Sequence, residues 1–112
     1  MVEIRTVNRK GSLMNNPIEK LNKTFDSRVR LGIMSALMVN EEVNFNALKD
    51  LIKVTDGNLA SHLKALEEIQ FIKVKKGFIG RKTNTNYAIT KAGEKAFQTH
   101  IEALEKMIRG MK

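Results

Sequence analysis

The spacing of large apolar residues changes twice along this chain, and these changes limit the folds that it can adopt. Leu59, Leu63 and Leu66 are separated by four and then three positions, the spacing of one face of an α-helix. Directly afterwards, Ile72 and Val74 alternate with lysines, which is the pattern of a half-buried strand. Helical spacing returns after residue 90. The sequence therefore predicts an α+β, mainly helical, fold that is interrupted by one β-hairpin.

Three short amphipathic helices are expected before residue 55. Their candidate N-caps are Asn16, then either Asp26 or Ser27, then Asn44, because such side chains accept hydrogen bonds from the free N–H groups of a first helical turn. Pro17 suits the first position of a helix, since that position has no intrahelical N–H bond to lose. The three expected helices span residues 17–26, 27–40 and 44–54. Met34 and Met38 of the second helix are expected to fill the core.

The helix expected over 55–70 has an unusual first half. Its leucines, continued by Ile69, form a buried stripe, whereas its front end is made of small and polar residues. A helix that enters the DNA major groove must bring its tip close to the base edges, where small polar side chains can donate and accept hydrogen bonds. We therefore interpret 55–70 as a recognition helix. Its candidate DNA-contacting residues are Thr55, Asp56, Gly57, Asn58, Ala60, Ser61, His62 and Lys64.

Two of these residues have two interpretations each. Asp56 suits the positive end of the helix dipole and either serves only there or also accepts a hydrogen bond from a cytosine amino group. His62 lies at the edge of the buried stripe and is either a boundary histidine with a partner in the protein or a donor to a DNA phosphate. Asn46, near the start of the preceding helix, is expected to contact the DNA backbone.

Positive charge is concentrated in parts of the chain. The chain carries 20 Lys and Arg against 12 Asp and Glu, a net charge of +8. Residues 71–91 contain basic residues and no acidic ones, and residues 1–30 also carry an excess, whereas residues 31–70 are net acidic. A basic segment without acids suits a polyanionic partner. A solvated basic surface is the alternative.

The basic segment 71–90 is expected to form a two-stranded hairpin whose tip contains two glycines and the four Asn and Thr residues at 83–86. Such a hairpin beside a recognition helix can reach phosphates or the minor groove, and Arg81 is the foremost candidate because guanidinium suits narrow grooves. The alternative is an exposed sheet edge that lysines protect from aggregation. The candidate DNA-contacting residues of the hairpin are Lys75, Lys76, Arg81, Lys82, Thr83 and Asn84.

The last segment, 91–111, is expected to be a long helix capped by Thr90. Its large apolar residues follow the four–three spacing of a coiled-coil seam from Phe97 to Met111, which indicates either a dimer interface or packing on its own domain. His100 is expected on the surface of this helix or in the dimer interface. Together with the first helix, the predicted dimerisation residues are Ile18, Leu21, Phe25, Phe97, Ile101, Leu104 and Ile108. The expected organisation is a flexible basic arm, 1–16, followed by one domain, 17–112.

Other classes of function find little support in the sequence. There is no cysteine, and His62 and His100 stand alone, so neither a metal centre nor a cofactor is expected. No nucleophile motif or phosphate-binding loop occurs, and the glutamate pairs at 41–42 and 67–68 are expected to face solvent. The chain is therefore not expected to be an enzyme. No apolar run approaches the length of a membrane span or a signal peptide, which favours a cytoplasmic protein without a membrane partner.

The chain resembles the winged helix-turn-helix transcriptional regulators of the MarR/ArsR kind over roughly residues 27–100. The matching patterns run from Arg30 to Leu37, from Leu51 to Ile72 and from Lys76 to Thr90, with small shifts of spacing. The resemblance implies a winged helix-turn-helix with a two-stranded β-hairpin wing and a long C-terminal dimerisation helix. It also implies a homodimer on palindromic double-stranded DNA, with 55–70 in the major groove, 71–90 as the wing and repression as the more common role.

The sequence departs from part of this group. Metal-sensing relatives use cysteine or clustered histidine and acidic residues, and this chain lacks both, so metal sensing is not expected. No effector pocket is marked. An apolar ligand could bind among Phe25, Phe97 and the methionines, although core packing explains these residues equally well. The alternative function is a winged-helix protein–protein interaction module that docks through its terminal helices, but such a module would need neither a bare helix tip nor an acid-free hairpin.

Overall fold

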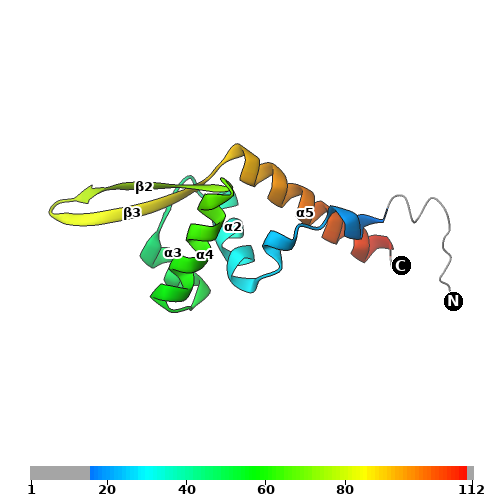
Figure 1. Cartoon of the computed structure of the whole chain (residues 1–112), viewed down its shortest axis with the longest axis horizontal. Coiled ribbons are helices and arrows are strands. Elements are labelled where there is room, and N and C mark those ends of the chain that lie inside the picture. Colours follow the sequence, from blue (N-terminus) through cyan, green and yellow to red (C-terminus); the bar gives the residue numbers. More distant parts are fainter. Residues whose placement is uncertain (1–15, 111–112) are drawn as a thin grey trace. The chain divides into compact units, whose positions relative to one another are not determined.

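The computed structural model describes residues 16–110, which form two compact units. One unit is formed by residues 22–98, and the other contains the described residues up to Leu21 together with those from Thr99 onward. The predicted α+β, mainly helical, class is confirmed (Figure 1). The basic arm predicted over 1–16 lies outside the described residues, apart from Asn16. The elements are η2 (Pro17–Lys20), η3 (Lys23–Phe25), α2 (Arg28–Val39), β1 (Val43–Asn44), α3 (Phe45–Ile52), α4 (Asp56–Glu68), β2 (Ile72–Ile79), β3 (Lys82–Ile89) and α5 (Lys91–Gly110).

The single helix predicted over 17–26 is wrong, because this segment forms two 3₁₀ turns. Asn16 does cap the first turn, accepting a hydrogen bond from the Ile18 N–H at 3.0 Å. The backbone then becomes extended at Leu21 (φ −69°, ψ 143°), and the side chain of Asn22 accepts a hydrogen bond from the Thr24 N–H. Asn22 therefore starts a new turn, and an α-helix cannot run through this position.

The predicted caps of the other helices are confirmed. Ser27, Asn44, Thr55 and Thr90 each accept a hydrogen bond from the backbone N–H three residues further on, at distances of 3.2, 2.8, 3.2 and 2.9 Å. A cap of this kind typically stabilises a helix by about 1 kcal/mol. The starts of α2, α3, α4 and α5 are therefore fixed by local sequence.

The core of the 22–98 unit is built on α2 and α4. The leucine stripe of α4 is buried as predicted, with each leucine at most 1% exposed, and Met34 is fully buried among the core side chains. Ile69 does not continue the stripe: it is 45% exposed, because α4 ends at Glu68 and Gln70 then takes a left-handed conformation (φ 65°). The remaining large core residues are Phe25, Ile33, Leu37, Leu48, Ile52, Ile72 and Phe97.

Phe25 and Phe97, both predicted to take part in dimerisation, are core residues of this unit. Their exposed fractions are 1% and 4%. Their rings meet edge to face with centroids 5.2 Å apart, and Phe25 also stacks on Phe71 at 5.7 Å. Such aromatic pairs stabilise a core beyond the area that they bury. Packing within the unit therefore explains both residues.

The sheet has three strands in the order β1–β3–β2, one more than predicted. β1 is only two residues long, with Val43 paired to Tyr87 and Asn44 to Asn86, so its sequence carries too few residues to display a period of two. The hairpin tip is also shorter than predicted. Residues 83–86 belong to β3, and only Gly80 and Arg81 lie between the paired residues Ile79 and Lys82.

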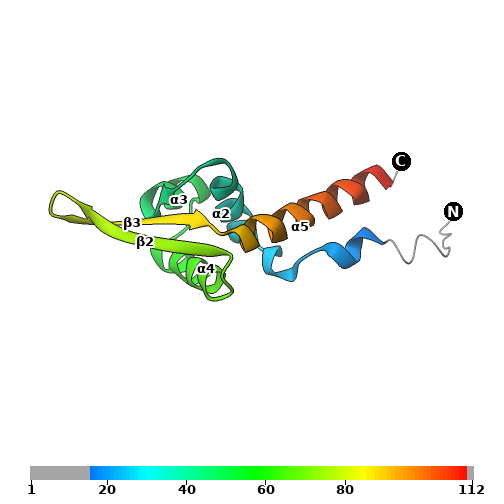
Figure 2. The same cartoon turned by 90° about the horizontal axis from the view of Figure 1, so that it is seen from above.

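Gly80 explains the short turn. Its φ of +64° is a conformation that glycine adopts without strain, and a two-residue hairpin turn needs a positive φ at its first or at both positions. The strands therefore remain paired almost to the end of the hairpin. Figures 1 and 2 show this hairpin as a long arm that extends beyond α3 and α4.

Helix α5 confirms the long helix predicted after Thr90. Its first turn lies directly against the start of β2, since the Thr90 N–H donates to the Phe71 carbonyl at 3.1 Å. His100 is only 3% exposed, so the expected surface position for it is wrong. Met111, the last residue of the predicted seam, lies outside the described residues. Within residues 16–110, no helix is both long and apolar enough to cross a membrane.

Candidate nucleic-acid interface

The first half of α4 presents an uncovered polar surface. All but one of its predicted DNA-contacting residues are exposed, and His62 is half-buried. On the opposite side, Leu59 and Leu63 are buried and hold the helix in the core. A Cβ built on Gly57 meets no atom within 4 Å, so packing inside the protein does not require glycine there. Another molecule can therefore approach the backbone of α4 closely at its tip. Its exposed candidate residues are Thr55, Asp56, Gly57, Asn58, Ala60, Ser61 and Lys64.

The acidic residue at this tip has a partner within the protein. Lys49 of α3 forms an ion pair with Asp56, with 2.7 Å between Nζ and Oδ1. The hydrogen bond from Lys49 to Asp56, followed by the attraction between their charges, raises the pKa of Lys49. The pair reduces the negative charge that α4 would otherwise present to a polyanion. A partner for Asp56 was not predicted from the sequence. Lys49 lies in the helix just before Asp56, and this position could have indicated the ion pair.

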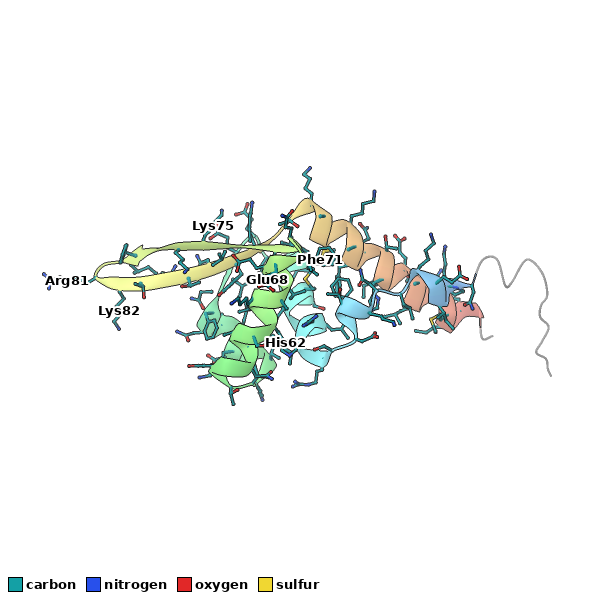
Figure 3. All side chains as sticks on the ribbon, in the orientation of Figure 1. His62, Glu68, Phe71, Lys75, Arg81 and Lys82 are labelled. Carbon is teal, nitrogen blue, oxygen red and sulfur yellow. The ribbon has the colours of Figure 1, made fainter. Side chains whose placement is uncertain are left out.

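His62 is held from α2. The Nε–H of Arg30 donates to Nδ1 of His62 at 3.0 Å, and an Nη of Arg30 reaches the Thr24 carbonyl at 3.4 Å. Burial, and then the charge of Arg30, lowers the pKa of His62. With Nδ1 as acceptor, the neutral ring carries its proton on Nε2. Nδ1 of His62 therefore has a partner within the protein, as the boundary interpretation expects. The Nε2–H group of the same ring remains a hydrogen-bond donor. Figure 3 shows His62 midway along α4.

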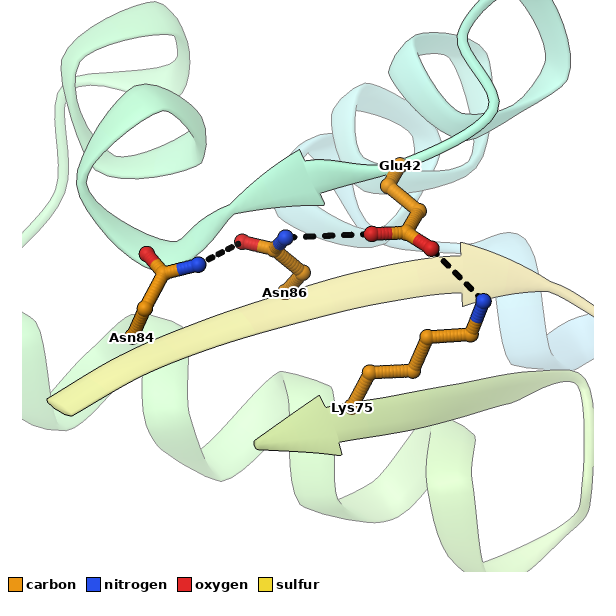
Figure 4. Close-up of polar contacts among 4 residues, drawn as sticks. All are labelled: Glu42, Lys75, Asn84 and Asn86. Carbon is orange, nitrogen blue, oxygen red and sulfur yellow. Dashed lines mark hydrogen bonds and ion pairs between the residues drawn. The ribbon is translucent and has the colours of Figure 1, made fainter. Parts of the chain in front are cut away.

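A polar network joins the loop before β1 to the base of the hairpin (Figure 4). Glu42 accepts from Lys75 at 2.6 Å through Oε2 and from the Asn86 amide at 3.0 Å through Oε1. The amide of Asn84 in turn donates to Asn86 at 3.2 Å. The hydrogen bond from Lys75 is the main cause of a lowered pKa for Glu42, and the same bond raises the pKa of Lys75.

This network changes the interpretation of two predicted residues. Glu42 does not simply face solvent, and Lys75 is already paired with a carboxylate. Sequence reasoning overlooked Glu42 and Asn86, because their contact depends on the short β1–β3 pairing, which has no periodic signature. Lys75 must therefore leave Glu42, or share it, before it can bind a phosphate.

The outer part of the hairpin carries unpaired polar side chains in solvent. Lys76, Arg81, Lys82 and Thr83 are exposed, and Arg81 stands at the end of the hairpin with Lys82 beside it (Figure 3). Asn84 is half-buried within the network at the hairpin base. No salt bridge within the described part of the chain involves the four exposed residues. Their donors are therefore available to an external acceptor.

Asn46, predicted to contact the DNA backbone, lies beside strand β3 of the hairpin. It is exposed at the start of α3. An open pocket of about 250 Å³ brings it together with two predicted hairpin residues. The full lining of this pocket is Asn44, Phe45, Asn46, Thr83, Asn84, Thr85 and Tyr87. The structure thus gathers predicted residues from α3 and β3 beside one another.

Known proteins share this arrangement of elements. It consists of helices α2, α3 and α4, then a basic hairpin, then a long helix. The family model of the winged helix DNA-binding domain matches residues 29–108. The chain belongs to this family. The β2–β3 hairpin is thus the wing of a winged helix, and α4 is the helix that precedes the wing.

Individual relatives agree with this assignment. An uncharacterized protein of Methanocaldococcus jannaschii, MJ0432, is 43% identical over 79 residues, which cover 70% of this chain and 86% of that protein. The structure of a transcriptional regulator homologue from Pyrococcus horikoshii OT3 matches this winged helix with a TM-score of 0.70 and 28% identity, over 84% of this chain and 98% of that one.

A putative MarR-family regulator from Porphyromonas gingivalis W83 shares the fold, with a TM-score of 0.62 and 19% identity over 93% of this chain and 97% of that one. The winged-helix part of the resemblance drawn from the sequence is confirmed by the family model, and the chain shares its fold with this MarR-family regulator.

The residues predicted for dimerisation fall into three groups in this winged helix. Phe25 and Phe97 lie in the core, as described above. Leu21 and Leu104 are half-buried. The isoleucines Ile18, Ile101 and Ile108 are 55%, 39% and 68% exposed. Among residues 16–110, no group of three or more histidine and acidic side chains could hold a metal ion.

Proposed function

We propose that this winged-helix protein is a sequence-specific, double-stranded DNA-binding transcriptional regulator. The observation that carries the proposal is the tip of α4, where small polar residues are exposed while Leu59, Leu63 and Leu66 anchor the helix from behind. In the major groove, Asn58, Ser61 and Lys64 supply the donors and acceptors that discriminate between bases, and Gly57 and Ala60 permit close approach.

The wing supplies attraction that the recognition helix lacks. Residues 31–70, which contain α4, are net acidic, whereas residues 71–91 carry basic residues only. Lys76, Arg81 and Lys82 therefore contribute mainly to affinity and to its salt dependence, through phosphates or the minor groove. Asn46 at the start of α3 adds a backbone contact.

We further propose that the protein acts as a homodimer on palindromic DNA, as a repressor that occludes its site. The exposed isoleucines at both ends of the described chain, Ile18, Ile101 and Ile108, are the support for a second copy. A two-fold dimer would place its recognition helices about 34 Å apart, in successive major grooves. The proposed domain organisation is a basic arm over 1–16 followed by one functional domain over 17–112.

Selection of bound sequences from a random duplex pool tests the DNA-binding proposal. The expected result is an enriched palindrome whose half-sites lie about 10 base pairs apart. Substituting Asn58 or Ser61 should change the enriched sequence, whereas substituting Arg81 should weaken binding to all duplexes. Recovery of an unenriched pool, with binding that does not depend on salt, would contradict the proposal.

Sedimentation of the full chain tests the dimer separately. Ile108→Glu is expected to convert a dimer to a monomer, because it introduces a charge into an apolar contact. Val39→Glu is the matched control, since Val39 is 81% exposed on α2 and belongs to no predicted interface. A monomeric wild-type protein that still binds DNA would remove the dimer from the proposal and leave DNA binding intact.

A further inference from the structure

Two large apolar side chains stand in solvent close to the end of the wing. Phe78 is 73% exposed and Ile79 is 68% exposed. Phe78 is the one exposed phenylalanine among the five in the chain, all of which the structure describes. Neither side chain belongs to the core, so neither contributes hydrophobic stabilisation to the folded chain. Their apolar surface is available to a binding partner.

The strand register places these two side chains on opposite faces of the wing. Phe78 pairs with Thr83, and Ile79 pairs with Lys82. Paired residues share a face of the sheet, while consecutive residues point to opposite faces. Each face of the wing tip therefore carries one apolar side chain, and Arg81 lies at the turn between them (Figure 3).

The charge around this tip restricts the kind of occupant. The neighbouring charged residues are Lys76, Arg81 and Lys82, and no acidic residue occurs from 71 to 91. An occupant must therefore combine negative charge with an apolar surface that Phe78 and Ile79 can reach. The DNA minor groove has both, because phosphates line its rims, and apolar wedges such as Phe and Ile enter between base steps from that side.

The root of the wing is fixed relative to the recognition helix. Phe71, between α4 and β2, stacks on Phe25 at 5.7 Å, and its carbonyl accepts a hydrogen bond from the Thr90 N–H at 3.1 Å. The wing then extends away from α3 and α4 (Figures 1 and 2). With α4 in a major groove, an arm that extends away from α4 would reach DNA outside that groove.

We propose that Phe78 and Ile79 form an apolar wedge that enters the minor groove beside Arg81. This inference rests on the proposed function and adds a contact that basic residues alone would not make. The wedge contributes affinity by burying apolar surface, so its contribution does not require counterion release. Arg81 and Lys82 release counterions when they bind phosphates, and their contribution falls with salt.

The experiment measures binding of the full-length protein to a duplex labelled with a fluorophore, across a salt series. Phe78→Ala together with Ile79→Ala is expected to weaken binding about tenfold at every salt concentration, with the slope of log affinity against log salt unchanged. Arg81→Ala together with Lys82→Ala should instead reduce the slope by up to about 1.8, or 0.9 per phosphate contact. The matched control, Val39→Ala, removes an exposed apolar group outside the wing and should bind as wild type.

Displacement of a minor-groove dye from the same duplex tests whether Phe78 and Ile79 contact the minor groove. The wild-type protein should displace the dye, and the Phe78→Ala, Ile79→Ala double variant should displace much less of it at equal occupancy of the duplex. Because both side chains are exposed, circular dichroism and the unfolding midpoint should be unchanged in this variant. Loss of dye displacement with retained fold supports the wedge.

Four outcomes would overturn the wedge. Wild-type affinity and dye displacement in the double variant would show that the apolar tip does not touch DNA. Unchanged duplex binding with lost binding to vesicles of phosphatidylserine and phosphatidylcholine would assign the tip to a lipid surface. Unchanged duplex binding with lost self-association would assign it to a second copy of the chain. Failure of the wild-type protein to bind any duplex would remove the proposed function itself, and the wedge with it.

Discussion

Arg30 of α2 donates a hydrogen bond to Nδ1 of His62 in α4 across 3.0 Å, and so ties α4 to the core helix α2. The contact requires an unprotonated Nδ1, because a histidinium ring has no acceptor. The position of α4 is therefore linked to the protonation state of one side chain.

Stability should depend on pH through His62. Its pKa in the folded protein lies below the unperturbed value of 6.5, chiefly because of burial and also because of the charge of Arg30. Between these two pKa values the unfolded chain binds more protons than the folded one, so stability rises with pH. The contribution is complete above about pH 6.5 and is lost as pH falls through the folded pKa. Urea unfolding midpoints at several pH values measure it.

His62→Gln is the variant that isolates this effect. It retains a polar side chain, removes the titrating ring and leaves His100 in place. Its stability should change less between pH 7.5 and 5 than that of the wild type. Identical pH profiles for the two proteins would mean that the link between Arg30 and His62 does not contribute.

Gly57→Ala should separate folding from DNA binding. A methyl group at Gly57 meets open space, so the substitution should leave stability unchanged or raise it by up to about 1 kcal/mol through the unfolded state. The same methyl group would stand between α4 and the base edges, so duplex affinity should fall several-fold. Urea midpoints and duplex titrations measure the two effects.

Gly110→Ala is the control for that substitution. A Cβ at Gly110 also meets open space, but the residue lies at the end of α5, outside the predicted DNA contacts. Its duplex affinity should equal that of the wild type. If Gly57→Ala binds as tightly as the wild type, the tip of α4 does not approach the bases closely.

Glu42→Gln should strengthen DNA binding. The carboxylate of Glu42 holds Lys75 at 2.6 Å, and its loss frees one ammonium group at the wing base for a phosphate. Duplex affinity should rise, and the slope of log affinity against log salt should become steeper by about 0.9. Glu41→Gln removes the same charge from the neighbouring residue without removing that hydrogen bond. Equal effects of the two variants would indicate a general effect of net charge and no release of Lys75.

Gly93→Ala should destabilise the protein. A Cβ at Gly93 would collide with the Phe71 carbonyl oxygen, so the backbone at the α5–β2 contact must move. Overpacking of this kind typically costs about 1–3 kcal/mol. Gly77→Ala in β2, where a Cβ meets nothing within 4 Å, should change the midpoint little. The thermal or urea midpoint measures both, and a Gly93→Ala protein as stable as the wild type would mean that α5 can shift without cost.

Local signals in the sequence were enough to predict most helices. Ser27, Asn44, Thr55 and Thr90 act as caps where they stand, because a cap needs only the turn that follows it. The leucine stripe of α4 was also predictable, since a helix with one apolar face must bury that face. The bare front half of α4 followed from the same pattern, as did the basic hairpin after it.

Other features depended on residues that are distant in the sequence. The contact between Phe25 and Phe97 in the core could not be predicted, because the spacing of a seam is the same whether a helix packs on a partner or on its own domain. Strand β1 and the pairing of Glu42 with Lys75 were likewise decided by the approach of residues 42–44 to β3.

The sequence alone thus determined the elements and their polarity: where helices begin, which faces are apolar, and which segments are basic or small. These properties arise from hydrogen bonds and periodicities within a few residues. The tertiary structure alone decided the partners: Lys49 for Asp56, Arg30 for His62 and Glu42 for Lys75. The reason is physical, because charges and hydrogen-bonding groups interact over a few ångströms in space whatever their separation along the chain.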